Sequence, residues 1–326
     1  MIRIHSLASA LSVAAFNALI LSSSHAQSDF PSKPIRMVVP FAAGGSTDVV
    51  ARILSHKLGE ALGQPLVIEN RPGAGSTVGV DSVAKSIPDG YTIAITANSA
   101  VAPGPLMRTH MPYDPIKDLA HIALIGTFVN SVQVRSDSPI KSLGDLIDTA
   151  RTHPGKRTYS TAGIGSSGWL TGELLKRQAK IDMLHVPYKG VGPAFVDLLA
   201  GRIDVMFQSA GAVAASIRDG KIRLLAESGA KRSRAYPDVP AIVESVSGVS
   251  GGAWFGVAAS AKTPLPTLLR LEKDFTTVLR DADTRKRLED MGMFPSGVGS
   301  AATLAHIHAE NALYGPIIKS MNIKVE

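Results

Sequence analysis

The sequence predicts an α/β protein of about two domains, and three observations lead to this prediction. Its 326 residues exceed the length of one ordinary domain. Hydrophobic residues make up 45% of the chain and charged residues 19%, which is a globular rather than a disordered composition. Short apolar runs alternate with segments of helical periodicity, and this alternation favours parallel strands joined by helices.

The first third of the chain alternates strand and helix patterns in this way. Ile35–Pro40 is a short apolar run that ends at a proline, as expected of a buried strand. Thr47–Leu62 carries apolar residues at helical spacing, with Val50, Leu54 and Leu58 on one stripe. The same patterns predict a strand over 66–69, a helix over 77–86 and a strand over 91–97.

The middle of the chain repeats this alternation, whereas the C-terminal part does not. Strands are expected over 131–135, 157–161, 183–186, 204–208 and 223–227, with helices over 142–152, 167–178 and 193–200 between them. After a last strand over 254–259, helices over 265–279, 282–291 and 302–321 follow with little strand between them. The alternating part predicts parallel sheets.

The N-terminal segment is typical of a secretory signal peptide. Arg3 precedes Leu7–Leu21, which is almost wholly apolar, and Ser24-His25-Ala26 then offers small residues at the positions that a signal peptidase reads. A membrane anchor is the alternative, but the apolar core is shorter than the roughly 20 residues that a span needs. We therefore expect residues 1–26 to be a signal peptide that is cleaved near Ala26. The mature protein is then expected to be soluble and exported to a bacterial periplasm.

The composition excludes several classes of function. No cysteine is present, so the chain has no disulfide, thiolate metal site or cysteine nucleophile. The formal net charge is +7, but the basic residues form no block, and aromatic residues are only 5%. A nucleic-acid partner is therefore not expected. We expect no cofactor and a monomer.

Four loops share one composition and each precedes a predicted helix. They are rich in glycine and small hydroxyl residues and cover residues 41–48, 71–77, 160–168 and 188–193. Glycine lets the backbone approach a ligand, and a helix start offers free N–H groups and about half a positive charge. Such loops meet at the carboxyl ends of strands in α/β folds. They predict a site for a small anion, most simply a carboxylate, although ordinary turns with serine or threonine caps are the alternative.

Enzyme signatures fail on their spacing. The last glycine of Gly73–Gly79 comes one position late for a dinucleotide loop, and no phosphate-binding P-loop or G-x-S-x-G motif is present. A hydrolase could be imagined with Ser160, Ser166 or Ser167 as the nucleophile and His185 as the base. A serine near a histidine by chance is, however, far more common than a catalytic triad. The close pair His306 and His308 does not share a helix face, so no metal site is expected.

Two further pairs of polar residues stand in or next to these loops. Asp48 and Arg52 have the i,i+4 spacing of an ion pair on the first helix. Tyr188-Lys189 is placed either to meet a carboxylate or to lie on the surface, and the sequence leaves both open.

A series of motifs in order along the chain carries a family resemblance. The opening motif is Pro40–Arg52, and Trp254-Phe-Gly256 is the last. Between them lie Glu69–Gly75, Pro88–Thr92, Pro112–Pro115, His185–Gly190, Lys231–Ser233 and Pro237–Pro240. Together these motifs resemble the Bug family, the extracytoplasmic receptors of tripartite tricarboxylate transporters, and the match covers essentially the whole mature chain.

The resemblance implies a two-lobed type II periplasmic-binding fold with the ligand in the cleft between the lobes. It places the first lobe at residues 27–126 and 240–326 and the second at 127–239. It implies binding of a small carboxylate without catalysis, and the membrane subunits of the transporter as partners. An exported serine hydrolase and a ligand receptor for a sensor kinase are the alternatives.

Loop composition and the resemblance together select the candidate ligand-binding residues. They are Phe41, Ala43, Gly44, Gly45, Ser46, Ala74, Gly75, Thr96, Asn98, Ser99, Ser160, Thr161, Gly163, Ser166, Ser167, Trp169, Tyr188, Lys189 and Gln208.

Two departures from the family pattern bear on the ligand. Gln208 follows a strand after which family members often carry an acid. The loss of that acid removes a partner for an amino group and favours simple or aromatic carboxylates over amino acids in the cleft. Gly168-Trp169 stands where relatives often have Asn-His. At the cleft Trp169 would favour a planar or apolar ligand body, and the alternative is a residue at a helix start that packs on its own lobe.

Overall fold

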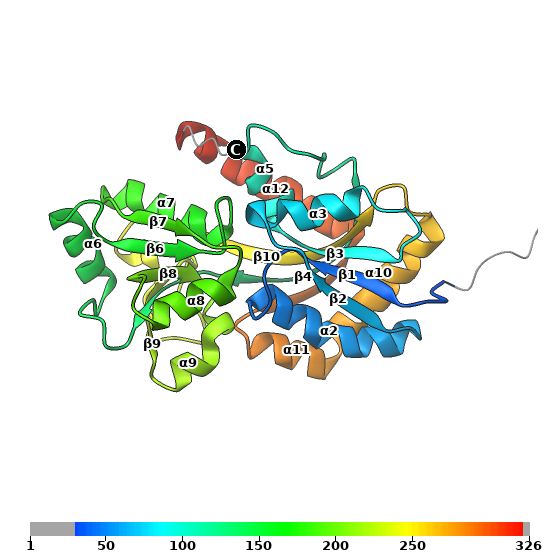
Figure 1. Ribbon diagram of the computed structural model, residues 1–326, viewed down its shortest axis with the longest axis horizontal. Helices are drawn as coiled ribbons and strands as arrows, with labels where there is room; N and C mark the ends of the chain where they lie inside the picture. The colour runs from blue at the N-terminus through cyan, green and yellow to red at the C-terminus, as the bar shows by residue number, and fades with distance from the viewer. Residues whose placement is uncertain (1–29, 322–326) are drawn as a thin grey trace, which may run out of the picture.

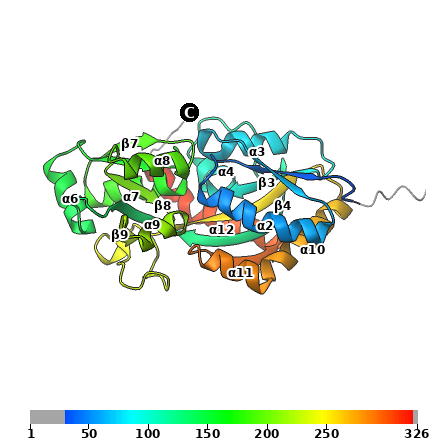
Figure 2. The ribbon, with the colours of Figure 1, turned by 60° about the horizontal axis from the view of Figure 1, so that its bottom comes forward.

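The computed structural model describes residues 30–321, which form two α/β lobes side by side (Figures 1 and 2). The predicted signal peptide lies outside these residues. The first lobe contains a six-stranded sheet in the order β11-β4-β10-β3-β1-β2. Its strands are β1 (Ile35–Val39), β2 (Leu66–Asn70), β3 (Thr92–Ala97), β4 (Leu119–Val129), β10 (Gly252–Ser260) and β11 (Phe294–Gly299). Its helices are α2 (Ser46–Leu62), η2 (Ala74–Ser76), α3 (Thr77–Ala84), α4 (Asn98–Val101), α5 (Pro103–Leu106), α10 (Leu265–Arg280), α11 (Ala282–Glu289) and α12 (Ser300–Met321).

The second lobe contains a five-stranded sheet in the order β7-β6-β8-β5-β9. Its strands are β5 (Ser131–Arg135), β6 (Thr158–Thr161), β7 (Leu184–Pro187), β8 (Val205–Gln208) and β9 (Ile222–Glu227). Its helices are α6 (Leu143–Thr152), α7 (Ser167–Ala179), α8 (Val191–Leu199), η3 (Ala210–Val213), α9 (Ala214–Arg218) and η4 (Ile242–Glu244). No helix within 30–321 combines the length and the apolar content of a membrane crossing.

Both sheets are mixed, whereas the strand–helix alternation predicted parallel ones. β1 pairs in parallel with β2 and β3, and β6 pairs in parallel with β7 and β8. β10, however, is antiparallel to β3 and β4, and β5 is antiparallel to β8 and β9. The reason is the path of the chain between the lobes. β4 and β5 lead out of the first lobe, and β9 and β10 lead back into it, so each outgoing strand has a returning strand as a neighbour.

Two strands in the described part of the chain were not predicted, β4 and β11. β4 is a long, nearly continuous apolar run in the middle of a sheet, and periodicity does not distinguish such a run from a buried helix. β11 contains Pro295, Gly297 and Gly299, which disfavour strands. An edge position tolerates such residues, and β11 is an edge strand.

Each sheet has its own hydrophobic core, and two segments from late in the chain join the second one. Ile242 and Val249 pack in the core of the second lobe, although the sequence placed 240–326 in the first. α12 contacts both lobes, because Ile307 lies in a first-lobe cluster while Tyr314 and Ile318 lie in the second-lobe core. We therefore propose that residues 240–249 belong with the second lobe and that α12 straps the two lobes together.

We expect Ile318→Ala to destabilise the protein by about 2–5 kcal/mol, because it leaves a cavity in the second-lobe core. Ile318 is 3% exposed, whereas Leu313 on the same helix is 62% exposed. Leu313→Ala is therefore the matched control and should cost far less. Urea denaturation measures both variants, and equal losses would contradict the strap.

Candidate ligand-binding site

A narrow cavity of about 30 Å³ lies between the two lobes. Residues that follow the carboxyl ends of β1, β3, β6 and β8 line it, as expected where helices begin after strands in α/β folds. We call this cavity the cleft. It is lined by Phe41, Gly45, Ser46, Thr47, Ala97, Asn98, Ser99, Phe128, Ala162, Ser166, Ser167, Val191, Gln208, Ala253 and Phe255. None of these side chains carries a formal charge.

The N-terminus of α2 opens into the cleft without a side-chain cap. Gly45 occupies the N-cap position with extended backbone (φ −89°), so no hydroxyl or carboxylate satisfies the first free N–H groups, those of Ser46 and Thr47. These N–H groups, together with the partial positive charge of a 17-residue helix, are suited to an anion.

Asp48 fixes the loop in front of this helix. Its Oδ2 accepts hydrogen bonds from Gly44 N and Arg52 Nε, both at 3.1 Å, and its Oδ1 accepts one from Asn70 Nδ2 at 3.1 Å. Burial raises the pKa of Asp48, but the hydrogen bonds from Arg52, Gly44 and Asn70 outweigh it, so the pKa lies below its usual value. The predicted Asp48–Arg52 ion pair is confirmed.

The N-terminus of α7 faces the cleft from the second lobe. Trp169 N donates a hydrogen bond to Ser166 Oγ at 3.3 Å, which caps the helix. Ser167 Oγ donates to Asn130 Oδ1 at 3.4 Å. Two helix starts from opposite lobes therefore meet at one cavity.

Two amide side chains complete the polar lining. Gln208 Nε2 donates to Ser46 Oγ at 3.1 Å, and this bond joins the second lobe to the start of α2. Asn98 Nδ2 donates to Glu310 Oε1 at 3.1 Å, behind the cleft. Glu310 also accepts a hydrogen bond from Trp254 Nε1. Burial raises the pKa of Glu310 to about 7, although the bonds from Trp254 and Asn98 oppose this shift.

A second pocket, the cleft mouth, shares Phe41 and Ala162 with the cleft and has a volume of about 230 Å³. Its other lining residues are Gly73, Ala74, Gly75, Ser76, Arg108, Gly163, Ile164, Pro187, Tyr188 and Lys189. Ala42 N donates to Lys189 O at 3.0 Å across the lobes, so the structure is a closed form. Arg108 Nη2 donates to Ala74 O, and Tyr188 OH donates to Asp197 Oδ2 at 2.6 Å.

Comparison with known proteins identifies the family. The family described as "Tripartite tricarboxylate transporter family receptor" matches residues 50–323. The chain belongs to this receptor family. The resemblance deduced from the sequence motifs is thereby confirmed, as is the binding-protein function that it implied.

Relatives of the receptor share its length and fold. Protein BugT of Bordetella pertussis (strain Tohama I) is 32% identical over 91% of this chain and 92% of its own. The structure of an R. palustris protein with adipate has a TM-score of 0.87 and 32% identity, and covers 91% of this chain and 100% of that one. MatC from Rhodopseudomonas palustris with bound malate has a TM-score of 0.82 and 31% identity, over 89% of this chain and 100% of that one. The predicted two-lobed periplasmic-binding fold is thus confirmed.

The receptor brings most of the predicted site residues together. Those that line the cleft are Phe41, Gly45, Ser46, Asn98, Ser99, Ser166, Ser167 and Gln208. Those that line the cleft mouth, apart from Phe41, are Ala74, Gly75, Gly163, Tyr188 and Lys189. All thirteen lie in or next to the turns that follow strands.

Six predicted residues do not line either pocket. Ala43 and Gly44 lie exposed on the loop before α2. Thr96 and Ser160 are completely buried within β3 and β6. The last two, Thr161 and Trp169, have partners inside the second lobe, where Thr161 Oγ1 lies 2.9 Å from His185 Nε2 and Trp169 packs in the core. Trp169 is only 8% exposed, so its position in the receptor differs from the predicted one at the cleft.

Sequence reasoning missed the apolar wall of the cleft and one basic residue at its mouth. Phe128 and Phe255 lie with ring centroids 4.9 Å apart, on β4 and β10. They line the cleft because both strands join the lobes, a tertiary feature with no local signal. Arg108 follows the short helix α5, and no motif marked it.

Glu310→Gln should remove a pH dependence of the receptor's stability. The pKa of Glu310 in the folded protein, about 7, lies above the usual glutamate value of 4.5, so the folded state favours the protonated acid. This stabilisation is complete below about pH 4.5 and is lost as the pH rises through about 7. Relative to Glu310→Gln, the wild type should lose on the order of 3 kcal/mol across this window. Urea denaturation at several pH values measures it, and parallel curves would contradict the prediction.

Proposed function

We propose that this receptor captures a small carboxylate in the cleft and delivers it to the membrane subunits of a tripartite transporter. One observation carries the proposal: the helix starts of α2 and α7 converge on one cavity from opposite lobes. Both direct free N–H groups and partial positive charge toward it, and no acidic side chain lines it. The relatives with bound adipate and malate support the carboxylate class.

Closure links capture to delivery in this proposal. The bonds from Gln208 to Ser46 and from Ala42 to Lys189 join the lobes directly, so they require the closed form. A carboxylate that contacts both helix starts stabilises the same form. Membrane subunits that recognise the closed form would then accept only loaded receptor. We further propose that residues 1–26 direct export to the periplasm and are removed after Ala26.

The side chains favour binding over hydrolysis. Ser166 caps α7, Ser167 donates to Asn130, and His185 is bonded to Thr161 rather than to a serine. Burial also lowers the pKa of His185 to about 4. Within residues 30–321, no hydrogen bond joins either serine to a histidine that would act as a base.

Small mono- or dicarboxylates should raise the melting temperature of the receptor, and their amides should not. A ligand that binds only the folded state stabilises it by about 2.7 kcal/mol at a hundredfold excess over its dissociation constant. For a chain of this size that is several degrees, at about 2–4 °C per kcal/mol. A thermal-shift panel of adipate and malate against adipamide and malamide measures it. Stabilisation by the amides alone would contradict the proposal.

Gly75→Ala should weaken carboxylate binding at least tenfold, about 1.4 kcal/mol. Gly75 has a φ of +58°, and an added Cβ would lie 2.3 Å from Ile164 O on the other lobe, so the variant holds the lobes apart. Gly220→Ala is the matched control, because Gly220 also has a positive φ (+67°) but open space around it. Isothermal titration with adipate compares them, and equal affinities would mean that closure does not need this contact.

A further inference from the structure

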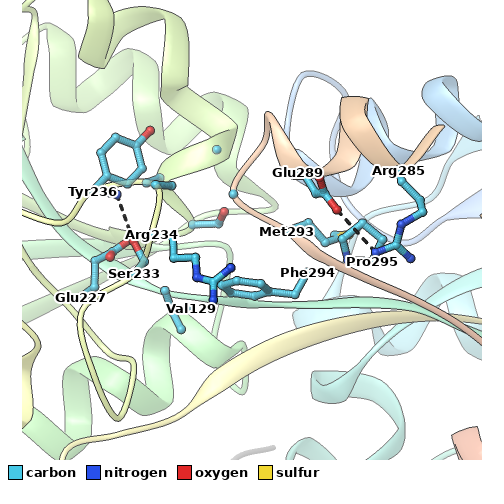
Figure 3. A pocket seen from close by; sticks show the side chains of 15 residues that line it. Val129, Glu227, Ser233, Arg234, Tyr236, Arg285, Glu289, Met293, Phe294 and Pro295 are labelled. Atoms are coloured by element: carbon cyan, nitrogen blue, oxygen red, sulfur yellow. Dashed lines mark hydrogen bonds and ion pairs between the residues drawn. The ribbon is translucent and has the colours of Figure 1, made fainter. Parts of the chain in front are cut away.

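A further cavity, which we call the back cavity, lies across the segments that join the lobes from the cleft. Figure 3 shows the side chains that line it. Phe128 and Gln208 line the cleft, whereas the next residues in the chain, Val129 and Ser209, line the back cavity. Successive residues of an extended chain point to opposite faces, so the two cavities lie back to back. The back cavity has a volume of about 430 Å³.

Both lobes build the back cavity. The second lobe contributes Glu227 and the loop 233–236, and the first contributes Arg285 and Glu289 of α11 together with residues 292–295. Figure 3 shows these two groups facing each other across the space. Arg285 and Glu289 form an ion pair with each other, so each of these two charges already has a partner.

Glu227 offers a buried oxygen that lacks a donor. Its side chain lines the back cavity, the residue is 2% exposed, and its Oε2 has no hydrogen-bond partner among residues 30–321. Burial raises the pKa of Glu227, and hydrogen bonds from Ser233 lower it by less. A buried carboxylate oxygen without a donor is costly, so the site favours a ligand that brings a cation or a strong donor.

Arg234 offers a guanidinium that lacks an acceptor. Its neighbour Arg232 pairs with Glu244 at 2.7 Å, but Arg234 takes part in none of the hydrogen bonds or ion pairs found in the described part of the chain. Figure 3 shows its side chain extending into the space beside Phe294. A guanidinium in this position is suited to a carboxylate.

An apolar wall completes the lining of the back cavity. Val129, Met293, Phe294 and Pro295 line it, and Phe294 is 50% exposed although it is a large hydrophobic residue. The back cavity therefore combines an anionic oxygen, a cationic fork and an apolar surface.

We propose that the back cavity is a second ligand site, which binds an α-amino acid with an apolar side chain. Its ammonium group would contact Glu227, its carboxylate would contact Arg234, and its side chain would lie on Val129, Met293 and Phe294. This site is separate from the cleft and does not depend on what the cleft binds.

Isothermal titration of the wild-type receptor tests the proposal, and the variants described below distinguish the back cavity from the cleft. The probes are L-phenylalanine, 3-phenylpropionate, which lacks the ammonium group, and 2-phenylethylamine, which lacks the carboxylate. L-Phenylalanine should bind at least about tenfold more tightly than either analogue, because each analogue leaves one buried or charged partner unmet. Binding of 3-phenylpropionate as tight as that of L-phenylalanine, or no binding at all, would overturn the proposal.

Variants assign any binding to the back cavity. Glu227→Gln and Arg234→Ala should each weaken L-phenylalanine binding at least about tenfold, whereas Lys231→Ala, on the same loop but outside the lining, should not. Arg234 is exposed, so its variant is informative even if the Glu227 variant folds poorly. Unchanged binding in Arg234→Ala would overturn the proposal. A wild-type receptor that binds L-phenylalanine but not adipate would instead contradict the carboxylate binding proposed for the cleft.

Discussion

Two like partial charges face each other across the cleft, and the rest of the arrangement follows from them. The starts of α2 and α7 each carry about half a positive charge, and closure brings them to one small cavity. Without an anion between them this proximity is unfavourable, so the charge of a ligand stabilises the closed form. The acid in the first turn of α2, Asp48, is held back from the cleft by hydrogen bonds from Arg52, Gly44 and Asn70. It orders the loop, and the N-terminus of α2 remains without a side-chain cap.

The turns after parallel strands were the part of the site that the sequence could predict. Glycine and hydroxyl residues between an apolar run and a helical pattern located Gly45, Ser46, Ser166 and Gly75, because strand–turn–helix units place such turns at one edge of a sheet. The i,i+4 pair on α2 was equally local and equally predictable.

The features that escaped prediction depend on tertiary structure. Trp169 occupies the first turn of α7 but packs in the core of the second lobe, and Thr96 is completely buried within β3. Loop composition and the family resemblance had placed both among the ligand-binding residues, because neither reveals which way a side chain points. Phe128 and Phe255 become wall residues only because β4 and β10 run between the lobes. The same crossing makes the sheets mixed, which the alternation of strands and helices along the chain could not reveal.

The strap formed by α12 has a consequence for the order in which the receptor folds. The second sheet comes from the middle of the chain, yet Tyr314 and Ile318, close to its end, fill part of the core beneath that sheet. A ribosome makes those residues last, so a nascent chain lacks a finished second core until translation is nearly complete. The core of the second lobe is therefore completed only at the end of synthesis, later than the strands that surround it.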